Sequence, residues 1–496
     1  MFGLTDRPQG QTNPVGTASH ARVDLSDWSV EYPDEVVDIA VPRILHQRIH
    51  SAKALTFVAE GSSIAPGDPI AFDAWSGDVA AQAQWSGVFE RGMLCSDGYF
   101  ALIEVSPAIA SLAPSDTAKT ALLERLSEMQ LMGLGGGGFL TAKKVKAAIE
   151  GGAEVLLINA VECEPDLGAD LWMLKHELCD VGDGISALME LGAFDRVVVT
   201  VCDTDEYLDL PKPKGGEVEV ERVVVPSGYP GGEERQLLRE VFGIFLAPLE
   251  RPSDHGVLVL NIGTVAALGA IARGELPDSR LIAVRGTAVD ASRLCRVRVG
   301  TPVSVVLDAL GIQHEQVEVY SGGAVMHERL ASLDEPVCWS TTGLLVETRG
   351  TGFDTVALQQ PCIRCDACLP VCPEDLSPLK LWDIVRRGRE EPALESHWLK
   401  CTQCRACDLV CPSHIPLAMA FGEVASRILI RHEEQQKAEL AKARFERHER
   451  RTAKRAVERA QRVKRKTHSV DTAQPASRVG DILAAARSRR AARSSR

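Results

Sequence analysis

Short apolar runs separated by turn signals dominate the first hundred residues of the chain. Residues 1–35 are polar and rich in turn formers, and we expect them to be disordered. Over residues 36–110, strand-length runs such as ALTFVAEG alternate with turn sequences such as GSSIAPGDP. This pattern predicts a small all-β module, whose composition indicates packing rather than a function.

Residues 118–255 change to alternating helix and strand patterns. TAKTALLERLSEMQLM has helical spacing, a glycine-rich loop and a second helix follow, and AEVLLINAVECEP is typical of a buried strand. A helix over 171–191 and strands over 196–203 and 218–226 complete a predicted α/β domain. Residues 256–340 add a strand and a helix around NIGT and then a β-rich stretch with one helix, which we interpret as a β-grasp-type module.

The rest of the chain is predicted to be mainly helical. Residues 341–430 hold two cysteine-rich loops beside the helical patterns LKLWDIVRRG and LAMAFGEVASRILIRHEE. Residues 431–496 form a basic tail, rich in Ala, Arg, Lys and Glu and poor in large apolar side chains. We predict an exposed helix that ends in a disordered segment.

Charge separates this tail from the rest of the chain. The formal net charge is -13, and the tail contains 20 Lys and Arg against 8 Asp and Glu, so residues 1–430 carry -25. Such an asymmetry indicates a partner or an anionic surface. Nucleic-acid binding is one interpretation of the basic run, but we favour a solvated helix with weak affinity for anionic lipid or an acidic partner.

Two features bear on the cellular compartment. The N-terminus has no basic-then-apolar signal pattern, and the longest apolar run, Gly256–Ala272, is too short and broken to span a bilayer. Any membrane association is therefore expected to be peripheral. Of the 14 cysteines, eight lie in two motifs and six are scattered along the chain. This distribution suits a reducing cytosol better than a disulfide framework.

The strongest chemical signal is a repeated spacing, C-x2-C-x2-C-x3-C-P. It occurs at Cys362, Cys365, Cys368, Cys372 and Pro373, and again at Cys401, Cys404, Cys407, Cys411 and Pro412. Structural zinc and disulfides are the alternatives, but zinc sites take cysteines in pairs and seldom use a third at the same short step. The spacing therefore predicts two [4Fe-4S] clusters and electron transfer.

The fourth Cys of such a run typically binds the other cluster of the pair. We therefore predict crossed ligation. One cluster would be held by Cys362, Cys365, Cys368 and Cys411, and the second by Cys401, Cys404, Cys407 and Cys372.

A second candidate site begins at the loop GLGGGGFLTAKK. Backbone N–H groups of a glycine run approach phosphate closely, and a helix N-terminus favours the anion. A flexible linker is the alternative, although the position between two helices and before a buried strand argues against it. The spacing is neither the Walker pattern nor a G-x-G-x-x-G after a strand.

Polar residues follow the predicted strand at Asn159, Glu162 and Glu164, where α/β sheets bind ligands. A solvated strand end is an equally weighted alternative. Glu233 and Glu234 open a helix after a Gly pair, an ordinary place for acidic residues that also allows them to face a cofactor.

Taken in order, these segments resemble one family, the RnfC (RsxC) component of the Rnf electron-transport complex. Its FMN and NADH domain is similar to the flavoprotein subunit of respiratory complex I. The resemblance covers about residues 38–430 and includes the glycine loop, INAVECEP, YPGGEERQL, VLNIGT, VRVGTPVS, SGGAVM and both cysteine motifs. The tail is similar to the C-terminal extension of proteobacterial members.

The resemblance implies roles for individual residues by position. The loop would wrap the flavin and its phosphate and border the nicotinamide and nucleotide, through Gly133, Gly135, Gly136, Gly138, Phe139 and Lys144. The strand ends and their following turns would line the isoalloxazine and ribose and hold the ribityl or phosphate, through Asn159, Glu162, Glu164, Glu233, Glu234, Asn261 and Thr264.

Two positions depart from the family pattern. Leu140 stands where the family usually has Pro, which we expect to loosen the loop. Asp166 stands where an aromatic residue is common, and its added negative charge would weaken the binding of an anionic dinucleotide.

The resemblance implies a multidomain α/β fold with a complex-I-flavoprotein-like FMN domain, an SLBB-like β-grasp module and a helical ferredoxin-type domain. It implies an ion-translocating oxidoreductase component with FMN and two [4Fe-4S] clusters as cofactors and NADH as substrate. Its partners would be the other Rnf subunits and, indirectly, ferredoxin or flavodoxin, but no nucleic acid. It would lie peripherally on the cytoplasmic side of the inner membrane. The alternatives are a soluble cobalamin-reductase-like flavin/iron–sulfur reductase and a non-catalytic electron relay with a decayed nucleotide site.

Overall fold

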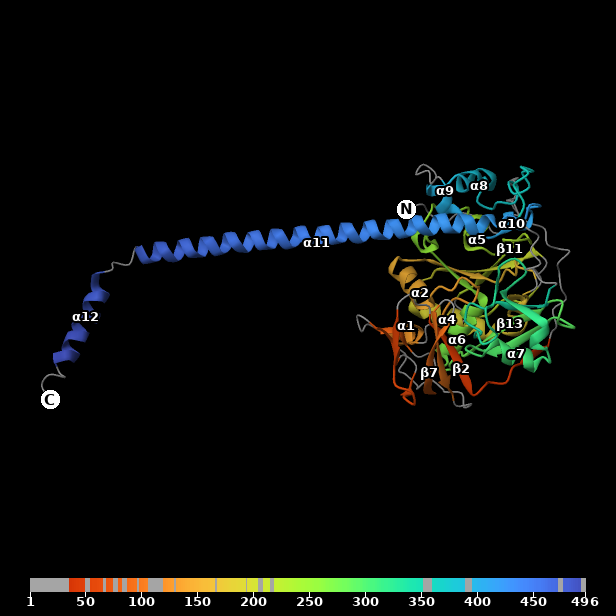
Figure 1. The fold of residues 1–496 in the computed structure, drawn as a ribbon, viewed down its shortest axis with the longest axis horizontal. Helices are drawn as coiled ribbons and strands as arrows, with labels where there is room; N and C mark the ends of the chain where they lie inside the picture. The colour runs from red at the N-terminus through yellow and green to blue at the C-terminus, as the bar shows by residue number, and fades with distance from the viewer. Residues whose placement is uncertain are drawn as a thin grey trace. The chain divides into compact units, whose positions relative to one another are not determined.

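The computed structural model divides into two units, Met1–Gly422 and Glu423–Arg496, which are described separately (Figure 1). The predicted disorder of residues 1–34 and the expected effect of Asp166 lie outside the described residues. Those residues are 35–49, 54–65, 68–74, 79–82, 87–95, 98–105, 119–128, 131–165, 167–192, 194–203, 208–214, 218–350, 359–388, 395–471 and 476–491.

Two antiparallel sheets form the N-terminal β region. The larger has the order β2 (Ile44–Ile49), β8 (Gly98–Glu104), β7 (Gly87–Cys95), β4 (Ser63–Ile64), and the smaller has β3 (Leu55–Phe57), β5 (Pro69–Asp73), β6 (Val79–Gln82). Alternate side chains of β2 are buried, and Phe57 stacks on Phe89 with ring centroids 5.8 Å apart. Alternating burial on short strands is what the period-two pattern predicts.

A parallel sheet forms the centre of the α/β region. Its order is β11 (Val220–Val225), β10 (Arg196–Cys202), β9 (Val155–Asn159), β12 (Val257–Asn261). The first four residues of β9 and of β12 are fully buried, as expected for strands covered on both faces. Because every pair is parallel, all four carboxyl ends lie at one edge.

Six helices accompany this sheet in the described chain, with bounds α1 (Lys119–Glu128), α2 (Thr141–Glu150), α3 (Ala169–His176), α4 (Leu178–Leu191), α5 (Glu234–Phe242) and α6 (Ile262–Ala272). Helices α4 and α6 lie side by side, and glycines such as Gly184 and Gly269 permit the close approach (Figure 1). The prediction of a single helix over 171–191 is wrong in one respect. The helix is interrupted at Glu177, which follows the end of α3 and precedes the start of α4.

A mixed six-stranded sheet forms the third region. Its order is β1 (Val36–Asp38), β14 (Arg293–Arg298), β13 (Ser279–Arg285), β17 (Gly343–Thr348), β15 (Val317–Gly322), β16 (His327–Arg329). Helix α7 (Val303–Ala309) packs on it through Val303, Val306 and Leu307. Two short 3₁₀ helices, Pro252–His255 and His314–Gln316, lie in connecting segments.

Strand pairing differs from the predicted grouping at three places. Strand β1 pairs with β14 rather than with the N-terminal β sheets. Strand β12 pairs with β9 in the parallel sheet, so β12 and the helix that follows it, α6, are part of the α/β region and not of the module predicted after it. Strand β17 pairs with β13 and β15 in the six-stranded sheet, although it lies beyond residue 340. Hydrogen bonding between distant segments decides which sheet a strand joins, and the local sequence pattern of the strand does not reveal its partner.

The cysteine-rich region consists of tight loops and short helices. The helices are α8 (Pro378–Arg386), α9 (Glu395–Lys400), α10 (Ala406–Leu409) and the start of α11 (Leu417–Asp471). Trp398 and Phe421 are both buried, with ring centroids 5.8 Å apart. The region is therefore packed by a small aromatic core as well as by whatever its cysteines bind.

The C-terminal unit is helical throughout its described part. Helix α11 continues to Asp471, and α12 (Ala476–Ala491) follows. Side chains from Glu433 to Lys464 are exposed, as predicted for a solvated helix. The expectation of disorder is wrong for residues 476–491, where frequent Ala and Arg favour helix. No helix in the described ranges is long and apolar enough to cross a membrane.

Candidate functional site

Asn159 and Asn261 lie opposite each other at the carboxyl edge of the parallel sheet. Asn261 caps α6 by accepting a hydrogen bond from Gly263 N at 2.9 Å. The Asn159 amide donates to the Gly232 carbonyl at 2.9 Å and accepts from Val161 N at 3.0 Å. The two asparagines therefore shape the turns that follow the strands, and they define the floor of the candidate site.

The glycine loop closes over this edge. Gly133 N donates to Phe139 O at 2.8 Å, so the loop returns on itself, and Leu134 N donates to the Thr264 hydroxyl at 2.9 Å. Thr264 is fully buried at the start of α6. The residues expected from VLNIGT and from the glycine run are thus brought together, although they are far apart in sequence.

This loop has the features of a phosphate cradle. A Cβ on Gly135 would come within 3.3 Å of Asn261, and Gly136 and Gly138 have φ of +85° and +60°. Leu140 provides no side-chain cap for α2, and the buried Thr141 hydroxyl has no hydrogen-bond partner among the described residues. An unpartnered hydroxyl at the start of a helix, beside a glycine loop, suits a phosphate-bearing cofactor such as FMN.

Leu140, at the position where Pro was expected, has a backbone conformation that a proline would share. Leu140 has φ of -62°, which is the value that a proline ring would impose. The residue also pairs with Met132 across the base of the loop. A proline ring would therefore fit this backbone, and the expected loosening stays a prediction.

Three half-buried carboxyl groups, Glu162, Glu164 and Asp170, follow strand β9 near the loop. Glu162 accepts from Asp170 N at 3.0 Å, and Asp170 accepts from the Asn261 amide at 2.7 Å. Burial, followed by the charge of Asp170, raises the pKa of Glu162 well above its usual range, and burial raises the pKa of Asp170 to about 6. Glu164 accepts from Val325 N at 3.0 Å and Met326 N at 2.6 Å, and burial raises its pKa as well. Such protonatable groups can donate or accept hydrogen bonds toward a heterocyclic ring.

Lys144 and the two glutamates after Gly232 form a second polar group of the candidate site. Lys144 Nζ lies 2.5 Å from Glu234 Oε1, so both expected residues are engaged with each other. Glu233 caps α5, accepting from Arg235 N at 3.0 Å and Gln236 N at 3.2 Å. Phe139, expected near the nicotinamide path, is 54% exposed and therefore open to a ligand.

Glu233 is expected to make stability depend on pH. Burial raises its pKa to about 7, against the opposing effect of its two backbone hydrogen bonds. Because this folded-state pKa exceeds the unfolded value of about 4.3, the stabilising contribution is complete below about pH 4 and is lost as the pH rises through about 7. Glu233→Gln does not titrate but keeps an oxygen for the cap. Its free energy of unfolding, relative to wild type, should rise by on the order of 2–3 kcal/mol between about pH 4 and 8. A difference that stays constant in thermal unfolding across this range would contradict the assignment.

Two charged residues in this site, Asp170 and Arg280, were missed by sequence reasoning. Arg280 is buried on β13 and donates to Leu134 O at 3.1 Å and to Trp339 O, which ties the glycine loop to the 336–342 segment. Its charge faces Asp170, while burial lowers its pKa to about 10. A cavity of about 240 Å³ lies beside Leu134, Asp170, Asn261, Gly263 and Arg280. The presence of an Arg inside the otherwise apolar strand pattern SRLIAVR was the sequence signal that could have identified Arg280.

The eight motif cysteines line two separate cavities. One is bordered by Cys372, Cys401, Cys404 and Cys407, and the other by Cys362, Cys365, Cys368 and Cys411. This is the grouping that crossed ligation requires, because Cys372 and Cys411 have exchanged places. We call these cavities the proximal and the distal cysteine cavity.

The two cysteine loops are structural repeats. Outside glycine, left-handed conformations occur in pairs at equivalent places of the two motifs, at Arg364 and Gln403, Asp366 and Arg405, and Asp375 and His414. Such conformations turn the chain tightly and aim successive N–H groups toward the cavity. His414 is one of these turn residues and is not among the residues that line either cavity.

Two family models match the chain. Residues 126–270 match the Nuo51 FMN-binding domain, and residues 361–415 match the 4Fe-4S dicluster domain. These matches confirm the predicted FMN domain and the predicted pair of [4Fe-4S] clusters, within a mixed α/β chain that has a helical C-terminal region.

Curated relatives share one description, the C subunit of an "Ion-translocating oxidoreductase complex". The chain is 33% identical to that of Cronobacter sakazakii over 75% of this chain and 48% of the relative, and 29% identical to that of Haemophilus influenzae over 71% and 54%. It thus spans about half the length of the curated relatives it matches. A solved NAD+-reducing [NiFe]-hydrogenase in its air-oxidized state is 20% identical, with a TM-score of 0.44 over 64% of this chain and 62% of that one, a likeness too distant to assign function.

Proposed function

We propose, from the homology of this chain to RnfC-type components of ion-translocating oxidoreductase complexes, that it accepts electrons from NADH at an FMN site and passes them through two [4Fe-4S] clusters. The clusters would deliver them to the other subunits of a membrane-bound complex and, indirectly, to ferredoxin or flavodoxin. Homology and the two matched domains support the proposal.

The observation that carries this proposal is a direct contact between the two candidate sites. The Tyr229 hydroxyl donates to the carbonyl of Cys404 at 2.7 Å, and Tyr229 begins the turn whose Gly232 accepts from Asn159. Tyr229, Val325 and Ala406 are buried together, with Cys163 and Cys404 beside them. A packed connection of this kind supports electron transfer between a flavin at the sheet edge and a cluster in the proximal cavity.

Each part of the flavin site has a task in this account. Bound FMN supplies the conversion between a two-electron hydride and single electrons. The glycine loop and the N-terminus of α2 would hold its phosphate, with Lys144 and Thr264 nearby. Asn159, Glu162, Glu164, Glu233 and Asn261 would orient the ring and the nicotinamide ribose. Arg280 would fix the loop through Leu134.

The positions of the two cysteine cavities support an order of electron flow. Tyr229 contacts Cys404, which lines the proximal cavity, while the distal cavity is lined by Cys365 and Ile363, both exposed at the surface. We propose the sequence flavin, proximal cluster, distal cluster, external acceptor. Exposed Ile363 and Leu369 beside the distal cavity suit the docking of an acceptor.

The remaining regions are assigned structural and tethering roles. We propose that the six-stranded sheet with α7 is the β-grasp, SLBB-like module. The predicted boundaries of 36–110, 118–255, 256–340, 341–430 and 431–496 would then shift only where β1, β12 and β17 pair with other sheets. The protein would lie peripherally on the cytoplasmic side of the inner membrane.

The tail is the proposed contact with the membrane surface. Residues 447–466 of α11 contain ten Lys and Arg against two Asp and Glu, whereas 432–446 are nearly neutral. A chain cut after Ile430 should keep its flavin and iron but lose binding to phosphatidylglycerol vesicles, because the basic segment is absent. Neutral phosphatidylcholine vesicles are the control in a flotation assay. Equal binding of the full and shortened chains to anionic vesicles would remove the tail from this role.

The proposed function is tested by adding NADH to the anaerobically purified chain. Flavin absorbance should bleach and both clusters should become reduced in EPR spectra. A chain whose clusters respond to dithionite but whose flavin and clusters ignore NADH would favour the electron-relay alternative instead.

A further inference from the structure

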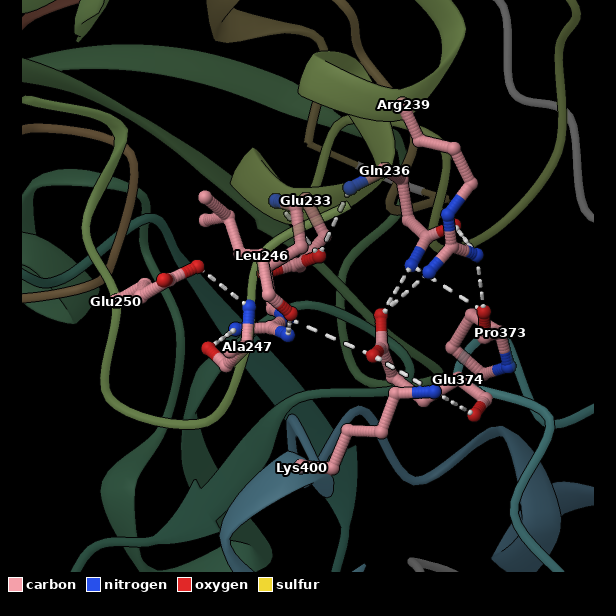
Figure 2. A network of polar contacts seen from close by, with 10 residues as sticks. Glu233, Gln236, Arg239, Leu246, Ala247, Glu250, Pro373, Glu374 and Lys400 are labelled. Atoms are coloured by element: carbon pink, nitrogen blue, oxygen red, sulfur yellow. Dashed lines mark hydrogen bonds and ion pairs between the residues drawn. The ribbon is translucent and has the colours of Figure 1, made fainter. Parts of the chain in front are cut away.

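A buried carboxylate follows directly after the Cys372–Pro373 turn of the proximal cavity. The Glu374 side chain is 1% exposed, and its Oε1 accepts from the Gln236 amide at 3.0 Å and from Arg239 at 3.2 Å (Figure 2). Its Oε2 lies 3.5 Å from Arg235 and 3.8 Å from Lys400. Glu374 and Cys372 also line the same cavity.

The group around Glu374 carries more positive than negative charge. Arg239 and Arg235 are 5% and 15% exposed, and Lys400, which precedes Cys401, is 35% exposed. Arg239 also donates to Pro373 O at 2.7 Å, and Lys400 donates to Glu374 O at 2.8 Å. These cations therefore grip the turn after Cys372 as well as the carboxylate. We call Glu374, Arg235, Arg239 and Lys400 the charge clamp.

The charge clamp is connected to the flavin edge through α5. Arg235, Gln236 and Arg239 lie on this helix, whose N-cap is Glu233. The preceding residue, Gly232, accepts from Asn159 at the end of β9. A continuous series of short contacts thus runs from the strand end to the loop of Cys372, and Figure 2 shows the part from Glu233 to Glu374.

We propose that Glu374 is a positioning residue that fixes the loop of Cys372 on α5 and, through its negative charge, holds down the reduction potential of the proximal cluster. This inference rests on the proposed function only for the identity of that cluster. Cluster potentials depend on nearby net charge and hydrogen bonds. Removing one negative charge from a buried site beside the cysteine thiolates favours the reduced, more negative cluster, while removing a cation does the reverse.

The test is an equilibrium EPR titration of the full chain with dithionite and mediators, which needs no NADH. Glu374→Gln keeps the shape and an acceptor oxygen. It should raise the one-electron equilibrium constant for reducing the proximal cluster about tenfold, a positive shift of about 59 mV. Lys400→Gln, at a partly exposed position, should shift the same cluster to lower potential. The distal cluster should not move in either variant.

Glu335→Gln is the matched control. Glu335 is also buried, pairs with Arg48 at 3.0 Å and accepts from Ala331 N, but it belongs to the six-stranded-sheet region and lines neither cysteine cavity. Its replacement should leave both potentials unchanged. Equal shifts in Glu374→Gln and Glu335→Gln, or no shift in Lys400→Gln, would overturn the proposal even where Glu374→Gln loses its cluster. If the variants shift as expected while the wild-type flavin and clusters do not respond to NADH, the charge clamp stands and the proposed function is refuted.

Discussion

Replacing Cys372 with Ala is expected to remove the same cluster as replacing Cys401, and not the cluster of its sequence neighbours Cys365 and Cys368. Iron should fall from about eight to about four atoms per chain, because one cubane of two is lost. The reason is the arrangement of the cavities, in which Cys372 lines the proximal cavity and Cys411 the distal one. EPR spectra of the dithionite-reduced variants identify which signal remains.

The converse pair provides the control. Cys411→Ala should leave the same spectrum as Cys365→Ala, and the two pairs should leave different signals. Scattered Cys179, which is exposed and far from both motifs in sequence, should be replaceable without iron loss. If Cys372→Ala instead matches Cys365→Ala, each motif holds its own cluster and the crossed assignment is wrong.

Gly136→Ala is expected to weaken flavin binding by at least about tenfold. Its φ of +85° costs an L-residue about 1–2 kcal/mol, and the new Cβ would come 3.3 Å from Thr342 Cγ2. The loop can relieve this strain only by moving away from the shape that Leu134 and Gly133 hold. Flavin content after purification and the Kd for added FMN measure the effect.

Gly152→Ala separates flavin loss from simple strain. Gly152 has a similar φ of +71°, but nothing lies within 4 Å of its Cβ position and it follows α2 instead of preceding it. Both variants should lose comparable thermal stability, and only Gly136→Ala should lose flavin. Retention of flavin in Gly136→Ala at wild-type affinity would exclude the loop as the phosphate cradle.

The cysteine spacing and the strand ends were sufficient to predict the main chemistry. Cys spacing is a local property set by tight loops, and a strand that ends in Asn159 or Asn261 reaches the same edge in any parallel sheet. The sequence therefore predicts where both candidate sites lie before any tertiary contact is known.

Residues whose role depends on distant partners were not predictable in the same way. Glu374 and Arg239 have the appearance of ordinary charged residues in their own segments, and only the packing of α5 on the Cys372 loop buries them together. The charges of Asp170 and Arg280 interact near the glycine loop for the same reason. Strand β1 joined an unexpected sheet because three residues of apolar pattern do not encode a partner.

The central claim is that one chain connects a nucleotide-reducible flavin to two clusters in a fixed order. Its most direct test is NADH reduction of two variants that each lack one cluster. Cys365→Ala, which lacks the distal cluster, should still reduce its proximal cluster as fast as wild type. Cys401→Ala, which lacks the proximal cluster, should bleach its flavin and leave the distal cluster oxidised. Rapid reduction of the distal cluster in Cys401→Ala, with an unreduced proximal cluster in Cys365→Ala, would contradict the account.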